Sequence, residues 1–175
     1  MKFASTLLAL AAVLSFPAQA AITVVNGDTT GDPTFNRLVE DLSGLSGVGT
    51  AVHYDTYSFT ASVAGNYTFL TTGVFDTFAF LYTGSFNPAT PLLNATAGND
   101  DLLPGFTTSG FAAALVTGQT YVHVTTAFDN SEFGVHSTTI GGPGVITAVV
   151  PEPATYGMLA LGLLAVGLRR RQQAA

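Results

Sequence analysis

The chain has 175 residues, of which 9% are charged and 47% are hydrophobic, and its formal net charge at pH 7 is −6. Four of its five basic residues lie near the two ends, so residues 21–150 combine one arginine, Arg37, with ten acidic residues and carry a net charge of −9. Such a body cannot bind nucleic acid by counterion release, and it is repelled by anionic lipids and polymers unless divalent cations intervene. Cysteine is absent, so no disulfide framework supports the fold.

The first 20 residues have the pattern of a secretory signal peptide. Lys2 precedes an apolar segment at 7–14, and Ala18 and Ala20 form a small-x-small cleavage pattern. The apolar segment is short and no charged cluster follows it, so a cleaved leader helix is favoured over a retained membrane helix. We therefore expect cleavage between Ala20 and Ala21 and export of the remaining chain.

Residues 21–148 are predicted to form a single β-sandwich domain, because their number is typical of one domain. They contain no persistent 3.6-residue apolar period, which favours an all-β sandwich over a helical fold. One short helical turn is expected at 37–42. Runs rich in aromatic and β-branched residues, separated by Gly, Asn, Pro and Asp, predict strands at 21–25, 52–60, 66–72, 77–82, 111–116, 119–126 and 132–140.

The spacing of these runs also predicts hairpins and a core. Gly65 and Gly118 each separate two runs, as expected of tight turns in which glycine adopts positive φ. The run at 77–82 is apolar on both alternating faces, which indicates a central strand. The core is expected to contain Tyr67, Phe69, Phe78, Phe80, Leu81 and Leu115.

Acidic and amide side chains near the predicted strand ends form a candidate calcium site. The set is Asp76, Asn99, Asp100 and Asp101. Hard oxygen ligands clustered on loops suit Ca²⁺, and extracellular calcium is abundant enough to fill a weak site. The alternative is that Asp and Asn occur there as turn-forming residues, for which there is a strong local mechanism. No other cofactor is expected.

Catalytic motifs are absent from the sequence. The three histidines, His53, His123 and His136, are not spaced as metal-enzyme ligands are, and His123 shares a strand face with Tyr121 and Thr125. There is no Gly-x-Ser-x-Gly segment, and the glutamates of the body stand in no distinctive context for sugar hydrolysis. We therefore predict that the domain is not an enzyme.

Residues 149–175 combine three features in a fixed order. Pro151-Glu152-Pro153 follows Val150 and is expected to be extended, because both prolines lack a backbone donor. Residues 154–168 carry no charge and predict a short helix of about 22 Å, against a hydrocarbon core of about 30 Å. Arg169, Arg170 and Arg171 follow, and they can reach the cytoplasmic headgroups. Together these features indicate a marginal, temporary membrane anchor.

This tripartite tail closely resembles the PEP-CTERM sorting signal of Gram-negative bacteria. In that family, an integral-membrane enzyme of transpeptidase type, exosortase, recognises the segment and removes the anchor. The resemblance implies a precursor anchored in the inner membrane, followed by delivery to the cell envelope or to the extracellular polysaccharide matrix. A plain C-terminal anchor with a proline linker is the alternative.

A second resemblance covers residues 53–144. The order of short motifs is similar to that of pre-peptidase C-terminal (PPC-like) domains. It comprises Tyr57-Ser58-Phe59, Gly65-Asn66-Tyr67, Phe75-Asp76-Thr77, Ser85-Phe86-Asn87-Pro88, Asn99-Asp100-Asp101 and Gly118 with Tyr121. These are small jelly-roll-like β-sandwiches appended to secreted bacterial proteins, where they have binding and accessory roles.

The sequence thus predicts an exported envelope or matrix protein with one PPC-like β-sandwich, flanked by a signal helix and a short transmembrane helix. Its expected role is structural or binding, with exposed aromatic rings stacking on exopolysaccharide. The alternative is a secreted polysaccharide hydrolase or an accessory domain of such an enzyme.

Overall fold

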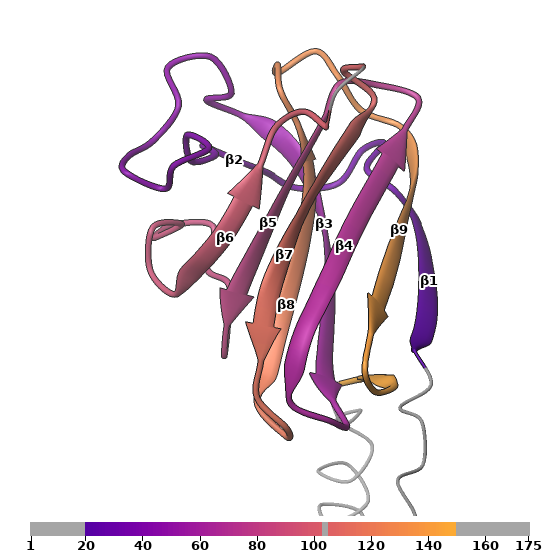
Figure 1. Cartoon of the computed structure of the whole chain (residues 1–175). Coiled ribbons are helices and arrows are strands. Elements are labelled where there is room, and N and C mark those ends of the chain that lie inside the picture. The colour runs from indigo at the N-terminus through magenta and orange to yellow at the C-terminus, as the bar shows by residue number, and fades with distance from the viewer. Residues whose placement is uncertain (1–19, 103–104, 150–175) are drawn as a thin grey trace, which may run out of the picture.

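The structure is a computed structural model, and it describes residues 20–102 and 105–149 (Figure 1). The described residues form β-strands and turns, and none of them lies in a helix long and apolar enough to cross a membrane. The predicted signal helix and the predicted helix at 154–168 lie outside these residues. The strands are β1 (Ala21–Asp28), β2 (Thr34–Phe35), β3 (Val52–Ala61), β4 (Gly65–Gly73), β5 (Thr77–Thr83), β6 (Ala95–Asn99), β7 (Thr108–Leu115), β8 (Thr120–Ala127), β9 (Val135–Gly142) and β10 (Ile146–Ala148).

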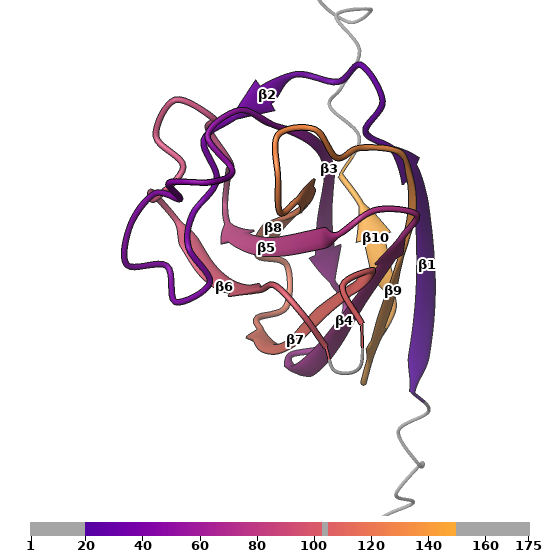
Figure 2. The same cartoon turned by 90° about the horizontal axis from the view of Figure 1, so that it is seen from above.

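The strands build two antiparallel sheets that stack as a sandwich (Figures 1 and 2). One sheet has the order β1-β9-β4-β7. The other has the order β10-β3-β8-β5-β6, with β2 paired to the start of β3. This arrangement confirms the predicted all-β sandwich, and β5 is an interior strand between β8 and β6, as its two apolar faces indicate.

The core between the sheets consists mainly of aromatic side chains. Phe59 of β3 packs with Phe69 of β4 and Tyr121 of β8, at ring-centre distances of 6.0 and 5.9 Å. Tyr67, Leu81 and Leu115 complete this cluster and are at most 2% exposed. All six predicted core residues are buried. Strand alternation directs Tyr67, Phe69, Leu81 and Leu115 between the sheets, whereas Phe78 and Phe80 point to the opposite face of β5 and are buried by a separate layer.

A second core lies on the outer face of the six-stranded sheet. There Phe78 and Phe80 of β5 are covered by Phe35 and Leu38 from the segment 29–50. Arg37 of that segment is only 3% exposed, and its guanidinium lies 4.3 Å from the centre of the Phe78 ring. The six-stranded sheet is therefore buried on both faces over its upper part, where Figure 1 shows the covering segment in violet.

The expected helical turn at 37–42 is wrong. The segment instead forms an irregular loop closed by a bridge between Leu38 and Leu45. Arg37 donates its main-chain N–H to the carbonyl of Gly49 at 2.9 Å, which ties the loop back on itself. Tertiary burial of Leu38 and Arg37 therefore overrides the weak local helical preference.

The sequence pattern did not predict β2, β6 and β10, and it placed the start of β9 three residues too early. β2 and β10 are too short to show an alternation, while β6 is built from small and polar residues with little β-propensity. The strand expected from residue 132 starts at Val135, because Glu132 accepts a hydrogen bond from the Asp129 N–H and closes a turn.

Candidate functional site

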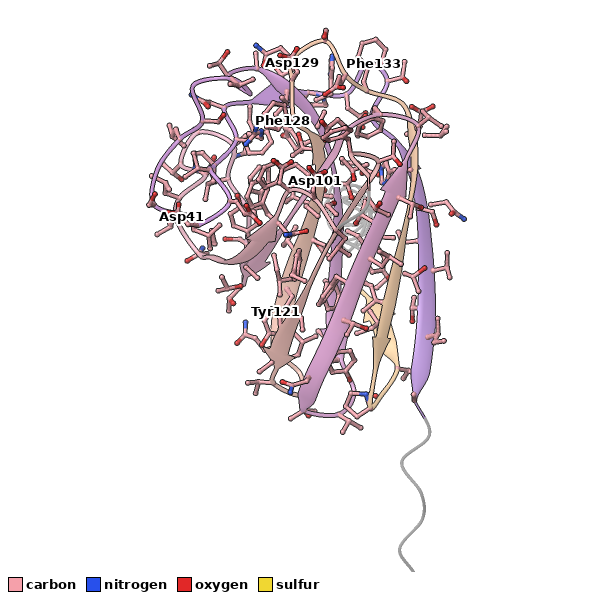
Figure 3. The ribbon with its side chains drawn as sticks, turned by 45° about the horizontal axis from the view of Figure 1, so that its top comes forward. Asp41, Asp101, Tyr121, Phe128, Asp129 and Phe133 are labelled. Carbon is pink, nitrogen blue, oxygen red and sulfur yellow. The ribbon has the colours of Figure 1, made fainter. Side chains whose placement is uncertain are left out.

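All charged side chains of the described body lie toward one end of the sandwich, which we call the acidic end. Figure 3 shows Asp41, Asp101 and Asp129 at this end, with Tyr121 toward the opposite one. The topology produces this segregation, because the segments that carry the charges meet where β1 and β6 end and β5 begins. The group comprises Asp28, Asp32, Arg37, Glu40, Asp41, Asp55, Asp76, Asp100, Asp101, Asp129 and Glu132.

Three carboxylates of the acidic end form the candidate metal centre. Asp76 precedes β5, and Asp100 and Asp101 follow its neighbour β6. One carboxylate oxygen from each residue lies within 4.8 Å of the other two. In each residue the Oδ1 atom is buried and has no hydrogen-bond partner. Buried carboxylate oxygens without partners are costly, so this arrangement suits a cation that accepts oxygen ligands.

Asn99, the fourth residue of the predicted set, is engaged elsewhere. Its Oδ1 accepts a hydrogen bond from the Gly110 N–H at 2.9 Å, and its Nδ2 donates to Glu40 Oε1 at 2.9 Å. The amide thus links β6 to β7 and to the covering segment. The structure brings together Asp76, Asp100 and Asp101, and calcium binding by them stays a prediction.

The electrostatic environment of the cluster opposes ionisation. Burial raises the pKa of Asp76 to about 6, and the neighbouring Glu132, Asp100 and Asp101 charges add to this effect. Burial and then the Asp101 charge likewise raise the pKa of Asp100 to about 6. The Arg37 charge lowers both values and so opposes these effects. Asp76 and Asp100 are therefore mostly ionised at neutral pH, at a free-energy cost that a bound divalent cation would offset.

Arg37 lies near the cluster and is held there by hydrogen bonds from its guanidinium to main-chain carbonyls. Its Nε and Nη2 donate to the Phe128 carbonyl at 3.2 and 3.0 Å, and its Nη1 donates to the Leu38 carbonyl at 2.9 Å. The guanidinium lies between the rings of Phe78 and Phe128, with its central carbon 4.8 Å from the latter ring centre. Arg37 thus contributes positive charge while its donors are committed to the fold.

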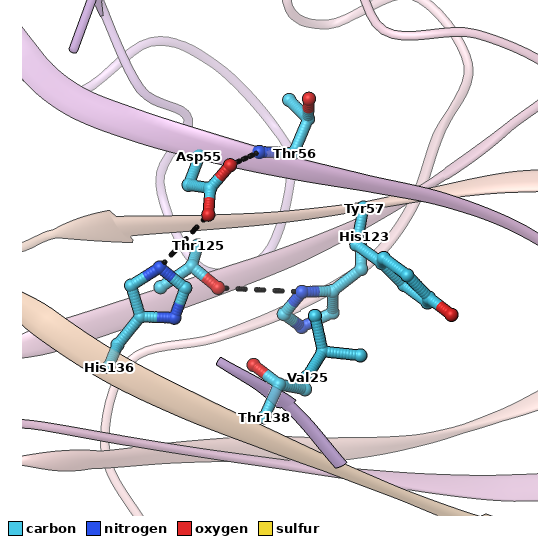
Figure 4. Close-up of a pocket in the computed structure, with 8 residues that line it drawn as sticks. All are labelled: Val25, Asp55, Thr56, Tyr57, His123, Thr125, His136 and Thr138. Atoms are coloured by element: carbon cyan, nitrogen blue, oxygen red, sulfur yellow. Dashed lines mark hydrogen bonds and ion pairs between the residues drawn. The ribbon is translucent and has the colours of Figure 1, made fainter. Parts of the chain in front are cut away.

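A small cavity between the two sheets holds two histidines and a carboxylate (Figure 4). His136 Nε2 of β9 lies 3.3 Å from Asp55 Oδ2 of β3, a distance typical of an ion pair when the histidine is protonated. This contact lowers the pKa of Asp55, chiefly through hydrogen bonding to His136. The cavity volume is about 20 Å³, which is room for one water molecule and excludes a substrate.

His123 of β8 is held neutral beside this pair. Its ring stacks on Phe69 at a centre-to-centre distance of 5.7 Å, and its nitrogens lie 3.5 Å from the hydroxyls of Thr71 and Thr125. Burial lowers the pKa of His123 to about 3, and the nearby His136 adds to the shift. His123 faces inward with Tyr121 and Thr125, as strand alternation predicted. A histidine of such low basicity is poorly suited to general-base catalysis at neutral pH.

The sequence did not predict the Asp55–His136 pair, and the residue that marks it, Gly27, lies in β1 but beyond the strand expected at 21–25. Gly27 lies opposite His136 in the β1–β9 register. A Cβ atom there would overlap Asp55 Oδ2 and lie 2.5 Å from His136 Nε2. Glycine inside a strand often marks such a close approach.

A groove on the outer face of the six-stranded sheet is a second candidate binding site and is larger than the histidine cavity. It has a volume of about 330 Å³ and lies below the region covered by the segment 29–50. Aromatic and hydroxyl side chains line it, which is the composition expected of a site for sugar rings. They are Tyr54, Thr56 and Ser58 from β3, and Ser85 and Phe86 from the loop after β5.

The residues of the predicted processing sites lie mostly outside the described part of the chain. These are Ala18 at the leader and residues 150–175 of the tail. The expected cleavage site falls immediately before β1, which begins at Ala21. Ala20 is exposed there.

Comparison with protein families identifies the tail. The model of the PEP-CTERM protein-sorting motif matches residues 149–171, which confirms the predicted sorting signal. The motif implies that the protein is exported, that its precursor is anchored in the membrane and that exosortase processes it. No curated protein matches the chain.

Several solved structures are similar in outline. The pre-peptidase C-terminal domain of a Bacillus anthracis collagenase has 15% identity and a TM-score of 0.41, covering 67% of this chain and 87% of its own. A periplasmic inhibitor of g-type lysozyme from Aeromonas hydrophila has 15% identity and a TM-score of 0.39, covering 78% and 93%. A CBM35 domain from Cellvibrio japonicus has 14% identity and a TM-score of 0.38, covering 73% and 99%. At these values, the similarities carry no conclusion about activity.

Substitution of Gly27 tests the packing around the Asp55–His136 pair. Gly27→Ala is expected to lower the free energy of unfolding by roughly 1–3 kcal/mol, because the added methyl must displace the carboxylate or the imidazole. Gly47→Ala is the matched control, since a Cβ there meets nothing within 4 Å. Chemical denaturation measures both, and equal stabilities would contradict the close approach.

Stability is also expected to depend on pH through His123. Its folded pKa of about 3 lies below the ordinary value of 6.5, so stability falls as pH decreases through that window. His123→Phe keeps a ring that can stack on Phe69 and removes this dependence. The free energy of unfolding of the variant minus that of the wild type should therefore rise by roughly 2 kcal/mol as the pH is lowered from 7 to 4.5. A constant difference in unfolding free energy over this range would contradict a buried neutral His123.

Proposed function

We propose that the mature protein, residues 21 to about 150, is a non-catalytic binding module of the cell envelope or extracellular matrix. In this proposal, its acidic end binds calcium and its outer groove associates with polysaccharide. The observation that carries the proposal is the cluster of Asp76, Asp100 and Asp101, each with a buried carboxylate oxygen that has no hydrogen-bond partner.

Calcium suits the acidic end better than other common cations. Three carboxylates can supply between three and six oxygens, and waters or main-chain carbonyls would complete the coordination of six to eight that Ca²⁺ takes. Mg²⁺ demands stricter octahedral geometry and releases its waters reluctantly. A bound divalent cation would also offset part of the net charge of the body, which favours contact with an anionic matrix polymer.

The route to this location follows from the two ends of the chain. The leader would be removed after Ala20, with Ala18 and Ala20 in the cleavage pattern and Ala21 as the first residue of the mature chain. At the other end, the proposed sorting residues are Val150, Pro151, Glu152 and Pro153, with Arg169, Arg170 and Arg171 holding the anchor at the cytoplasmic face. Exosortase would then release the domain from the inner membrane.

The groove supports association with a polysaccharide. Thr56 is exposed at its centre, and Tyr54 and Phe86 form an edge-to-face aromatic pair beside it, with ring centres 5.2 Å apart. Hydroxyl groups next to aromatic surface provide both hydrogen bonds and apolar contact for a sugar ring. The alternative, a polysaccharide hydrolase, lacks a specific supporting geometry among the described residues, where the histidine cavity has room for a single water.

Calcium is expected to raise the melting temperature of the purified chain by several degrees, since it binds only the folded state. Asp76→Asn should abolish this rise. In the absence of calcium at pH 7 the same variant should be more stable than the wild type, because the raised pKa makes ionisation of Asp76 unfavourable in the fold. Asp41→Asn is the control, since the exposed Asp41 caps its own turn through Ser43. A wild-type melting temperature unchanged by calcium would sink the proposed site.

Retention on exopolysaccharide purified from the producing cells tests the groove. Thr56→Glu should weaken retention at least several-fold by filling the groove with a charged side chain, whereas Thr72→Glu, on the outer face of the other sheet, should retain normally. The wild type should release no reducing ends from the polymer. Product release that a single acidic substitution abolishes would instead support the hydrolase alternative.

A further inference from the structure

We propose that the end of the sandwich opposite the acidic end rests on the outer leaflet of the membrane while the precursor is anchored. We call it the hairpin end. It consists of the β3–β4 turn (62–64), the β7–β8 turn (116–119) and the β9–β10 turn (143–145). The inference rests on the membrane anchor predicted at 154–168, and its partner is a lipid surface.

The described residues of the hairpin end are uncharged over a long distance. No charged residue occurs in the segments 56–75, 77–99, 102–128 and 133–149. Asp55 lies six residues before the end of β3, or about 20 Å along the strand, and Asp28 lies seven residues from the start of β1, or about 23 Å. Both separations exceed the Debye length of about 8–10 Å at physiological salt, so the acidic end contributes little repulsion at an anionic lipid surface.

Exposed valines occupy the three turns. Val63, Val116 and Val145 are 45%, 62% and 57% exposed, and each belongs to a different turn. Exposed apolar side chains also occur at the acidic end, but there they stand among carboxylates, as Phe133 does beside Glu132. Only a surface without charges can enter the interfacial region of a bilayer without a desolvation penalty for ions.

The three turns are linked to one another and so form one surface. The Ser62 N–H donates to the Val145 carbonyl at 3.0 Å, and the Gly118 N–H donates to the Ala61 carbonyl at 3.2 Å. The Tyr67 hydroxyl donates to the Val63 carbonyl at 2.8 Å, which fixes the β3–β4 turn to the core. A preformed surface loses little conformational entropy when it meets the membrane.

The segment 150–153, which we call the tether, joins the domain to the predicted anchor, and its length selects this orientation. The Val149 N–H donates to the Ser58 carbonyl at 2.8 Å, three residues, or about 10 Å, from the end of β3. The anchor predicted to start at Ala154 follows five residues later, a reach of at most about 17 Å. The hairpin end is within that reach. The opposite end of β3, at Val52, is about 20 Å from Ser58, and the acidic loops lie beyond it. An anchored chain therefore cannot turn its acidic end to the bilayer.

Single-tryptophan variants of the full chain test the orientation, because the wild type contains no tryptophan. Val116→Trp places the probe at the hairpin end, and Phe133→Trp is the matched control at the acidic end. Both chains are reconstituted into phosphatidylethanolamine–phosphatidylglycerol vesicles, with and without brominated acyl chains, and fluorescence is excited at 295 nm. Circular dichroism checks the fold, and Val145→Trp replaces the first variant if it fails to fold.

The expected result is a blue-shifted emission that brominated lipid quenches at least twofold more strongly for Val116→Trp than for Phe133→Trp. Equal quenching of the two probes would overturn the proposal. So would a blue shift without quenching, which would instead indicate contact with a second copy of the chain. If the chain does not float with the vesicles, it has no membrane anchor, and the proposal is overturned. Calcium binding is measured separately by the melting temperature, so failure here leaves the proposed calcium site standing.

Discussion

Burial of both faces of the six-stranded sheet is the constraint on which the rest of the structure depends. Its inner face packs on the four-stranded sheet through Phe59 and Leu81, and its outer face packs on the segment 29–50 through Phe78 and Phe80. That segment stays in place because Arg37 is buried between two aromatic rings and donates to two main-chain carbonyls. Such donors are costly to leave unpaired, so Arg37 specifies the position of the covering layer.

The covering layer also determines what remains open. It leaves the lower part of the outer face free, where Thr56 and Ser58 face a groove, and it brings Glu40 next to β6 at the acidic end. The same layer carries the positive charge of Arg37 close to Asp76 and Asp100. The groove and the acidic cluster are thus consequences of one packing arrangement, and a single exported domain combines a candidate cation site with a candidate surface for sugars.

Because the charges are segregated, the two ends of the sandwich differ in their surface chemistry. Its carboxylates gather at one end, while the start of β1 at Ala21 and the last described residue, Val149, lie toward the uncharged end. In the anchored precursor, the acidic end would point away from the bilayer and into the envelope space, where divalent cations and matrix polymers are available. After release from the anchor, the same end would be free to bridge to the matrix through calcium. Transport and the proposed binding would therefore use opposite ends of the domain.

The sequence by itself determined the export and sorting signals, the all-β class and the six core residues, because each rests on local composition or on strand alternation. It also named Asp76, Asp100 and Asp101, since acidic residues near predicted strand ends are visible without a structure. Only the tertiary structure decided that their carboxylates meet, that Asn99 is engaged by Gly110 and that residues 37–42 form a loop rather than a helical turn. It likewise brought together Gly27, Asp55 and His136, which are far apart in the chain. Those outcomes depend on which strands pair and which layers pack, and such long-range contacts leave almost no periodic pattern in the residues that make them.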